Sequence, residues 1–263
     1  MITSVRNPKI RWVRSLVARP RARREAQAFV IEGVRLAEEA LSAGWEAQLV
    51  LYSRELGSRG LKVVEQYVEK GIQVEEVTPA ALRGVSDTDT PPGILLVLSI
   101  QHTPILPQAD FLLILDGLRD PGNLGTILRS AAAAGVQAAL LTPGTTDAFA
   151  PKVVRSAMGA HFRIPLHSLT WQEIGAYVAQ VRSQGDFHVY LADATEGEVY
   201  TKADFHSPLA IILGGEAEGA VSEAYEIADG HIHIPMPGGT ESLNVAVAAT
   251  VLLFEVVRQR GNP

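Results

Sequence analysis

The stretch "IPMPGGTESLNVAVAATVLLFEVV", residues 234–257, joins two segments of opposite character. The first is a polar loop with two prolines and two glycines, whereas no charged residue occurs from Leu243 to Phe254. An uncharged run of about a dozen residues is too short to span a bilayer, which takes about 20. The stretch therefore predicts a polar loop that leads directly into a buried helix.

The composition is that of a globular protein with a sizeable core. The 263 residues are 47% hydrophobic and 20% charged, which allows one large domain or two ordinary ones. The chain contains no cysteine. Disulfides, thiolate zinc sites and cysteine nucleophiles are therefore excluded, and we expect a reducing cytoplasmic location.

The net charge of −6 conceals a basic N-terminus. Residues 1–30 carry eight Lys or Arg and one acidic residue, a net charge of +7, so the remainder carries −13. Such a cluster favours a surface that binds a polyanion, although an organelle transit peptide and a merely solvated basic face remain alternatives. The basic residues are Arg6, Lys9, Arg11, Arg14, Arg19, Arg21, Arg23 and Arg24.

The first 100 residues predict a small α/β unit. A helix begins near Pro8, with Ile10, Val13, Leu16 and Val17 on one face. After it, short apolar strands alternate with amphipathic helices up to the strand "ILLVLSI". The segment "QHTPILPQAD" contains two prolines and predicts a boundary near residues 101–109. We therefore expect domains at 1–104 and 108–263.

Four apolar strands with helical stretches between them follow that boundary. This alternation predicts a parallel sheet covered on both faces, with ligand chemistry in the loops at the carboxyl ends of the strands. The strands are "FLLILDG" (111–117), "AALLT" (138–142), "FHVYLAD" (187–193) and "LAIILGG" (209–215).

Three loops that each follow a predicted strand contain glycine and polar residues. In the first, Asn123 is a plausible helix N-cap, and Arg129 follows six residues later. In the second, the pair Gly214-Gly215 permits close approach to the backbone, but the dinucleotide fingerprint G-x-G-x-x-G is absent. The third is the opening stretch.

The three loops resemble the motifs of one family, in order and in separation. "NLGTILR" (123–129), "LGGEAEG" (213–219) and "IPMPGGTESLNVAVA" (234–248) resemble those of the SpoU/TrmH-type RNA ribose 2′-O-methyltransferases of the SPOUT superfamily. The segments 29–41 and 151–165 extend the resemblance over nearly the whole chain.

This resemblance implies an α/β fold whose C-terminal parallel-sheet domain contains a deep trefoil knot, a rare exception to unknotted connections. It also implies a smaller N-terminal α/β domain similar to ribosomal RNA-binding proteins. The knotted domain is expected to form a homodimer, S-adenosyl-L-methionine is the expected methyl donor, and no metal is required.

The resemblance also implies roles for individual residues. The catalytic set is Asn123, Arg129, Glu216, Ser242 and Asn244, with Arg129 reaching the site of the other subunit. The cofactor set is Gly214, Gly215, Ile234, Met236 and Leu243; position 215 often holds another small or polar residue in the family. The expected RNA contacts are Arg11, Arg14, Arg21, Arg23, Arg24 and Arg155.

A guanidinium keeps its proton at any ordinary pH, which disfavours Arg129 as a general base. We expect Arg129 to stabilise the developing alkoxide and a neighbouring phosphate, while the proton leaves through that phosphate or water.

Several alternatives remain open. The appended N-terminal domain favours ribosomal over transfer RNA, on resemblance alone. Methylation of a base and a catalytically silent RNA-binding or assembly factor are rival functions. A metal enzyme is a third, because His231 and His233 lie on one face of a predicted strand, but two ligands make a poor site.

Overall fold

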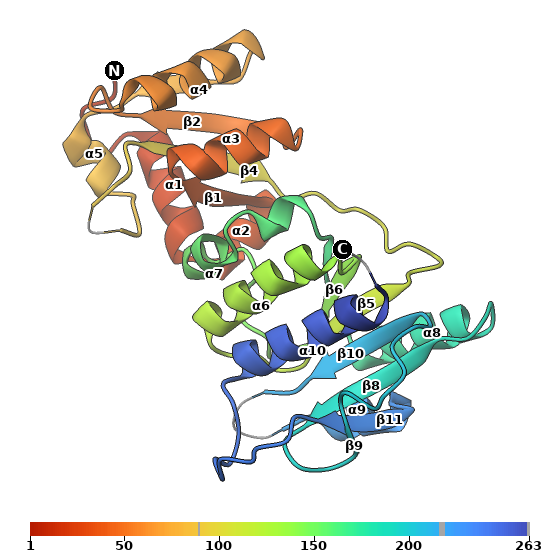
Figure 1. The fold of residues 1–263 in the computed structure, drawn as a ribbon. Coiled ribbons are helices and arrows are strands. Elements are labelled where there is room, and N and C mark those ends of the chain that lie inside the picture. Colours follow the sequence, from red (N-terminus) through yellow and green to blue (C-terminus); the bar gives the residue numbers. More distant parts are fainter. Residues whose placement is uncertain (89, 216–218, 262–263) are drawn as a thin grey trace. The chain divides into compact units, whose positions relative to one another are not determined.

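The computed structural model describes residues 1–263 except 89, 216–218 and 262–263 (Figure 1). It contains two compact units. The N-terminal unit comprises Met1–His102 and Asp147–Phe162, and the C-terminal unit comprises Thr103–Thr146 and Arg163–Pro263. The units differ from the predicted domains in one segment, because residues 147–162 pack within the N-terminal unit.

The N-terminal unit is built on a four-stranded sheet with the strand order β1-β4-β2-β3. Its strands are β1 (Ala28–Glu32), β2 (Ala47–Tyr52), β3 (Val74–Glu76) and β4 (Ile94–Ser99). Its helices are α1 (Pro8–Ala18), α2 (Pro20–Ala26), α3 (Val34–Ser42), α4 (Ser58–Glu69), α5 (Pro79–Arg83), α7 (Pro151–Ala157) and the 3₁₀ helix η1 (Ala160–Phe162).

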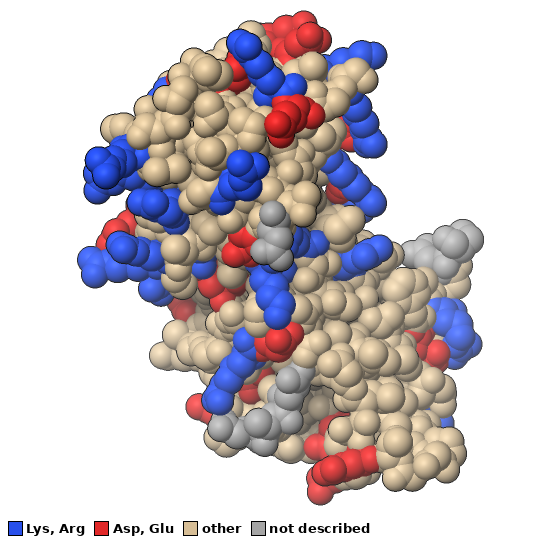
Figure 2. All heavy atoms as spheres, turned by 90° about the vertical axis from the view of Figure 1, so that its left-hand side faces the viewer, with Lys and Arg blue, Asp and Glu red and all other residues tan. Residues whose placement is uncertain are grey.

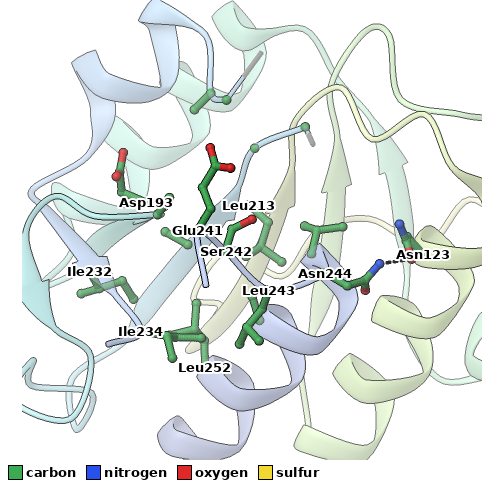
Figure 3. A pocket seen from close by; sticks show the side chains of 18 of the residues that line it. Asn123, Asp193, Leu213, Ile232, Ile234, Glu241, Ser242, Leu243, Asn244 and Leu252 are labelled. Atoms are coloured by element: carbon green, nitrogen blue, oxygen red, sulfur yellow. Dashed lines mark hydrogen bonds between the residues drawn. The ribbon is translucent and has the colours of Figure 1, made fainter. Parts of the chain in front are cut away.

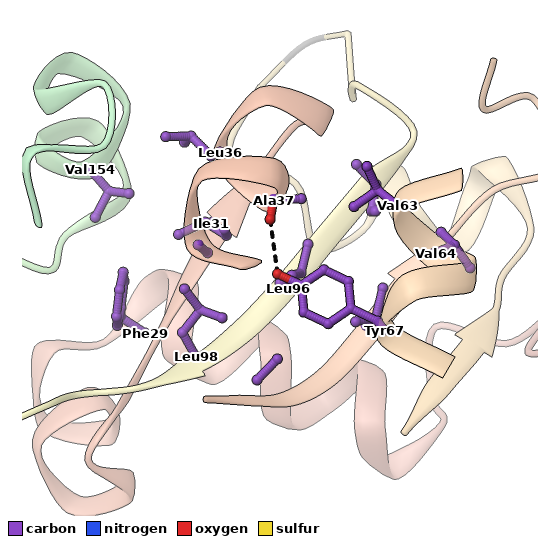
Figure 4. Close-up of a cluster of buried hydrophobic side chains, with 14 of the residues drawn as sticks. Phe29, Ile31, Leu36, Ala37, Val63, Val64, Tyr67, Leu96, Leu98 and Val154 are labelled. Atoms are coloured by element: carbon purple, nitrogen blue, oxygen red, sulfur yellow. Dashed lines mark hydrogen bonds between the residues drawn. The ribbon is translucent and has the colours of Figure 1, made fainter. Parts of the chain in front are cut away.

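Separate apolar clusters cover the two faces of this sheet. One joins the sheet to α3, α4 and Val154 of α7, and there the buried Tyr67 hydroxyl donates a 2.9 Å hydrogen bond to the Ala37 carbonyl (Figure 4). The other contains Ile10, Val13 and Leu16 of α1. The predicted apolar face of the basic helix is thus confirmed.

The C-terminal unit contains a seven-stranded sheet with the order β7-β6-β5-β10-β8-β11-β9. Every pairing in it is parallel, which confirms the predicted sheet type. The strands are β5 (Phe111–Leu115), β6 (Ala138–Leu141), β7 (Leu166–Ser168), β8 (His188–Asp193), β9 (Glu198–Val199), β10 (Leu209–Leu213) and β11 (Gly230–His233).

Helices pack on both faces of this sheet (Figure 1). Residues of α8 (Trp171–Arg182) and α9 (Ser222–Ile227) share one core cluster with the strands. On the other face, α6 (Pro121–Ala134) packs against α10 (Val245–Gln259), and the Ser130 and Thr250 hydroxyls lie 2.7 Å apart. The sheet thus fixes the starts of α6 and α10 at one edge.

Helix α10 is buried on one face in the single chain, which confirms its predicted core contact for that face. Its residues Ala249, Leu252 and Leu253 are buried, but Val247 and Phe254 are 49% and 44% exposed. The uncharged run therefore covers the sheet with one face and leaves an apolar face uncovered in the single chain. Among the described helices, none is both long and apolar enough to cross a membrane.

Candidate active site

A cavity of about 780 Å³ lies at the carboxyl ends of the central strands of the C-terminal unit (Figure 3). Such a position is where parallel α/β sheets bind ligands, and the volume suits a small-molecule ligand. The lining residues are Asp120, Asn123, Ala192, Asp193, Ala194, Leu213, Gly214, Gly215, Gly219, Ala220, Tyr225, Ile232, Ile234, Met236, Glu241, Ser242, Leu243, Asn244, Val245, Ala248 and Leu252.

The glycine loop after β10 lets two backbone segments meet. Gly215 and Gly219 form an antiparallel bridge, and a Cβ atom at Gly214 would lie 2.7 Å from the Ala220 nitrogen. The buried Asp116 at the end of β5 accepts a 3.1 Å hydrogen bond from the Val221 amide. Glycine at position 214 is therefore required by the close packing of the backbone.

The starts of α6 and α10 meet through a pair of asparagines. The Asn244 carboxamide caps α10 by accepting from the amides of Ala246 and Val247, and its Nδ2 donates to Asn123 Oδ1 at 3.1 Å. Asn123 does not cap α6, contrary to the prediction, because Asp120 is the N-cap and accepts from the Asn123 amide at 2.7 Å. The side chain of Asn123 is therefore directed to Asn244 instead.

Most of the predicted catalytic and cofactor-binding residues line this one cavity. The exceptions are Glu216, which falls outside the described residues, and Arg129, which is exposed on α6 and is not a lining residue. The lining residues that had been predicted are Asn123, Gly214, Gly215, Ile234, Met236, Ser242, Leu243 and Asn244.

Sequence reasoning missed the acidic side chains and the tyrosine of the cavity. Asp120, Asp193 and Glu241 are lining residues, as is Tyr225 of α9. Asp193 had a readable signal, because it is the last residue of a predicted strand. Tyr225 lines the cavity because of the way α9 packs on the sheet, and no local sequence pattern indicates that position.

The predicted RNA contacts on α1 border a separate hollow of about 520 Å³ in the N-terminal unit. Arg11 and Arg14 are exposed there beside Trp12 and Arg19. Figure 2 shows basic side chains spread over the visible face of this unit, with acidic ones among them. The hollow thus combines cationic groups with an aromatic ring.

The other predicted RNA contacts differ in their exposure to solvent and in their ion pairs. Arg21 and Arg24 are exposed, and Arg21 pairs with Glu25 at 2.6 Å. Arg155 forms an ion pair with Asp87. These three remain accessible at the surface to different degrees.

Arg23 is a buried structural residue, which makes the prediction that it contacts RNA wrong. Its side chain is 4% exposed and pairs with Asp147 at 2.7 Å. It also donates to the carbonyls of Leu16 and Val17 at 2.6 and 3.1 Å. With its donors bound inside the protein, the guanidinium cannot also bind a phosphate.

The histidines considered as metal ligands are placed by other contacts. The His231 ring packs edge-on against Tyr225 with centroids 5.1 Å apart, and His233 Nδ1 lies 3.1 Å from the Gly197 carbonyl oxygen. Within the described parts of the chain, no three His, Cys, Asp or Glu residues are grouped so that they could hold a metal ion.

Comparisons with known proteins match both parts of the chain. The SpoU rRNA Methylase family model matches residues 110–254, and a model of the MRM3-like substrate binding domain matches residues 7–96. The 23S rRNA (guanosine(2553)-2′-O)-methyltransferase RlmP of Bacillus subtilis is 34% identical over 97% of this chain and 98% of its own. The human mitochondrial rRNA methyltransferase 3 is 33% identical over 92% of this chain and 70% of its own.

Solved structures agree over the full length. The SpoU methyltransferase AviRb from Streptomyces viridochromogenes, in complex with the cofactor AdoMet, has a TM-score of 0.88 at 28% identity and covers 98% of this chain and 100% of its own. An AdoMet-bound rRNA methyltransferase from Sinorhizobium meliloti has a TM-score of 0.87 at 29% identity and covers 98% of this chain and 97% of its own.

Proposed function

Because this chain belongs to the SpoU rRNA methylase family, we propose that it transfers a methyl group from S-adenosylmethionine to a ribose 2′-hydroxyl in ribosomal RNA. The family membership confirms the resemblance read from the three sequence motifs. The observation that carries the proposal is the cavity, which brings together Asn123, Gly214 and Asn244, one residue from each motif.

The cavity fits the proposed cofactor. Its volume of about 780 Å³ lies within the usual range for small-molecule sites, and the close-packed backbone at Gly214 forms one wall. We assign the cofactor to the backbone groups of Gly214, Ile234 and Leu243, with Gly215 and Met236 also lining it. When bound, S-adenosylmethionine supplies a methyl group already activated by its positively charged sulfur.

The remaining task of the protein is to hold the 2′-hydroxyl in line with that methyl group and to exclude water. Positioning of this kind can lower a barrier by several kcal/mol. The Asn123 and Asn244 amides supply hydrogen-bonding groups at one side of the cavity, and the Ser242 hydroxyl lies between them and Asp193 (Figure 3). Together with Glu216, these are the proposed catalytic residues of one subunit.

We assign Arg129 to the cavity of a partner subunit in a homodimer. Arg129 is exposed on α6, which packs against α10, and α10 presents the exposed apolar side chains of Val247 and Phe254. Covering that face with a second copy would bury them and leave Arg129 next to the interface. There its guanidinium would stabilise the developing alkoxide and grip a neighbouring phosphate, while the proton leaves through phosphate or water.

A mixing experiment tests this assignment. The inactive variants Arg129→Ala and Asn244→Ala are combined, because a heterodimer regains one intact site only if Arg129 acts across the interface. Random exchange of subunits should then restore about a quarter of wild-type activity. Absence of recovery in a sample shown to contain heterodimers would place Arg129 in the cavity of its own chain.

The deep trefoil knot belongs to the same proposal. It would include the segment from β11 to α10, which contains the third motif and lines the cavity. A crystal structure traced through residues 209–259 tests it directly, since an unknotted path would remove this part of the proposal.

Ribosomal RNA is the proposed substrate because the relatives RlmP and rRNA methyltransferase 3 are named for it and because residues 7–96 match a substrate binding domain. The N-terminal unit would bind structured RNA through phosphates, which position the substrate without specifying its sequence. We place this activity in the cytoplasm, in keeping with a chain that lacks cysteine. Cell fractionation that recovers the protein in another compartment would contradict this.

The defining experiment incubates the protein with methyl-labelled S-adenosylmethionine and unmodified transcripts of ribosomal and transfer RNA. Each RNA is then digested and the labelled nucleoside identified. The expected result is a 2′-O-methyl nucleoside from ribosomal RNA, lost on Asn244→Ala. Label on a base would overturn the ribose assignment, and label only in transfer RNA would overturn the substrate.

A further inference from the structure

Asp193 lines the cavity but has no part in the proposed methyl transfer. It is the last residue of β8 and lies on the side of the cavity away from Asn123 and Asn244 (Figure 3). Those two asparagines mark the reacting end of the proposed site. Asp193 is therefore placed to bind a part of the cofactor that does not react.

The two carboxylate oxygens of Asp193 have different surroundings. Oδ1 accepts hydrogen bonds from the amides of Thr195 and Glu196, both at 2.9 Å, and these fix the orientation of the group. Oδ2 has one long contact, 3.4 Å to the Tyr225 hydroxyl. Because a carboxylate offers about four acceptor positions, Oδ2 retains the capacity to accept from a ligand.

Asp193 is held as an acceptor only. Partial burial acts to raise its pKa, but the amides of Thr195 and Glu196, the Tyr225 hydroxyl and nearby His231 act against burial, and the net pKa is lowered. The packing of the Tyr225 ring against His231 also positions the tyrosine hydroxyl beside Oδ2. An ionised carboxylate in this place calls for a ligand with hydrogen-bond donors.

The charge of the whole cavity also favours a ligand with hydrogen-bond donors. Asp120, Asp193 and Glu241 are among its lining residues, and Lys and Arg are absent from the lining that the structure describes. Such a site repels a phosphate and accepts a hydroxyl or a cation. It suits a nucleoside without phosphates, and strand-end carboxylates bind ribose hydroxyls in other α/β nucleotide sites.

We propose that Asp193, supported by Tyr225, recognises the ribose hydroxyls of the bound methyl donor through Oδ2. This assignment rests on the proposed function, and it makes Asp193 a cofactor-binding residue outside the three sequence motifs. Hydrogen bonds to an ionised carboxylate are among the stronger ones, so removing the charge should weaken binding about ten- to a hundred-fold.

Calorimetric titration of Asp193→Asn with two ligands tests this. S-adenosylhomocysteine contains the adenosine ribose and an amino-acid end, whereas 5′-methylthioadenosine contains the same ribose but lacks the amino-acid end. The expected result is an equal loss of affinity for both. The matched control Glu226→Gln changes an exposed carboxylate on the same helix as Tyr225 and should leave both affinities unchanged.

A third ligand sharpens the test. Wild-type protein should bind 5′-methylthio-2′-deoxyadenosine more weakly than 5′-methylthioadenosine, and Asp193→Ala should bind the two alike, because the group that distinguishes them has gone. Thermal unfolding of each variant controls for loss of fold.

The outcomes separate the two proposals. A loss of affinity for S-adenosylhomocysteine alone would assign Asp193 to the cofactor's ammonium group and overturn the ribose assignment. Unchanged affinity for both ligands would also overturn the ribose assignment. If wild-type protein bound neither ligand and methylated no RNA, the proposed function itself would fail.

Discussion

Two polar contacts each join residues more than 100 positions apart, and they have opposite surroundings. In the N-terminal unit, Arg23 pairs with Asp147, 124 residues away, and its side chain is only 4% exposed. In the C-terminal unit, Asn244 donates to Asn123, 121 residues away, at the wall of an open cavity. In the first contact the guanidinium is closed off from any ligand, whereas the second contact is available to one.

This comparison shows that burial, more than residue type, decides the role of a polar side chain. A buried charge must be satisfied inside the protein, so its loss is felt in stability. A hydrogen-bonding group beside a cavity can also serve a ligand, so its loss is felt in activity. Variants of the two contacts should therefore have different consequences.

The largest expected effect is on stability. Arg23→Ala removes the buried cation that pairs with Asp147 and takes its donors from the Leu16 and Val17 carbonyls. This loss should lower the free energy of unfolding by about 3–5 kcal/mol. Chemical denaturation measures this. Arg24→Ala, which removes an exposed arginine of the same helix, should change stability by less than about 0.5 kcal/mol; equal effects of the two variants would contradict the structural role of Arg23.

The next effect is on activity. Asn244→Ala should reduce methyl transfer about 100- to 1000-fold, in the range seen on removal of an oriented donor at an active site. It should also cost about 1 kcal/mol of stability, because Asn244 caps α10.

Asn244→Asp separates these two roles. Aspartate can still accept from the amides of Ala246 and Val247, but it cannot donate to Asn123. Stability should therefore be kept while methyl transfer is lost. Activity close to that of the wild type would show that the contact between the asparagines is only structural.

A third effect depends on pH and lies near the buried ion pair. Burial of His161 lowers its pKa to about 4, although the Ala148 carbonyl and Asp147 oppose the shift. In the unfolded chain the imidazole titrates near 6.5, so as pH falls the unfolded state binds the proton first. The free energy of unfolding should fall between about pH 6.5 and 4, by at most about 1.4 kcal/mol per pH unit from this group.

Denaturation curves of the wild type and of His161→Gln check this dependence. The variant should be less stable at pH 7.5 but lose less stability on acidification. His206→Gln, which changes an exposed histidine, should follow the wild-type profile. Parallel profiles for His161→Gln and the wild type would contradict the proposed titration.

The smallest effect concerns the exposed arginines. The double variant Arg11→Ala/Arg14→Ala should leave stability unchanged and weaken binding of structured RNA. The slope of log K against log[salt] should become shallower by about 0.7–0.9 per lost phosphate contact. Filter binding over a range of salt concentrations measures this. Lys70→Ala, an exposed site on α4's C-cap, is the control; an equal change there would show that α1 holds no specific binding surface.

Local patterns predicted much of the fold. Periodicity and strand spacing predicted the apolar face of α1 and the parallel type of the larger sheet. They also predicted the strands β1, β2, β3, β4, β5, β6, β8, β10 and β11. The short strands β7 and β9 were missed, since neither has a fully buried residue and neither lies in an apolar run that would indicate a strand. The Asn123 cap was misassigned because Asp120, three residues earlier, competes for the same helix start.

The sequence by itself determined the family and the motifs, because their residue types and spacing are local properties of the chain. It also determined that Arg23 is cationic, but not that Arg23 would be buried and paired with Asp147. Only the tertiary structure decided which face of α10 stays exposed and that Asp193 and Tyr225 line the same cavity as Asn244. These facts depend on contacts between segments far apart in the chain, and no short-range periodicity carries information about such contacts.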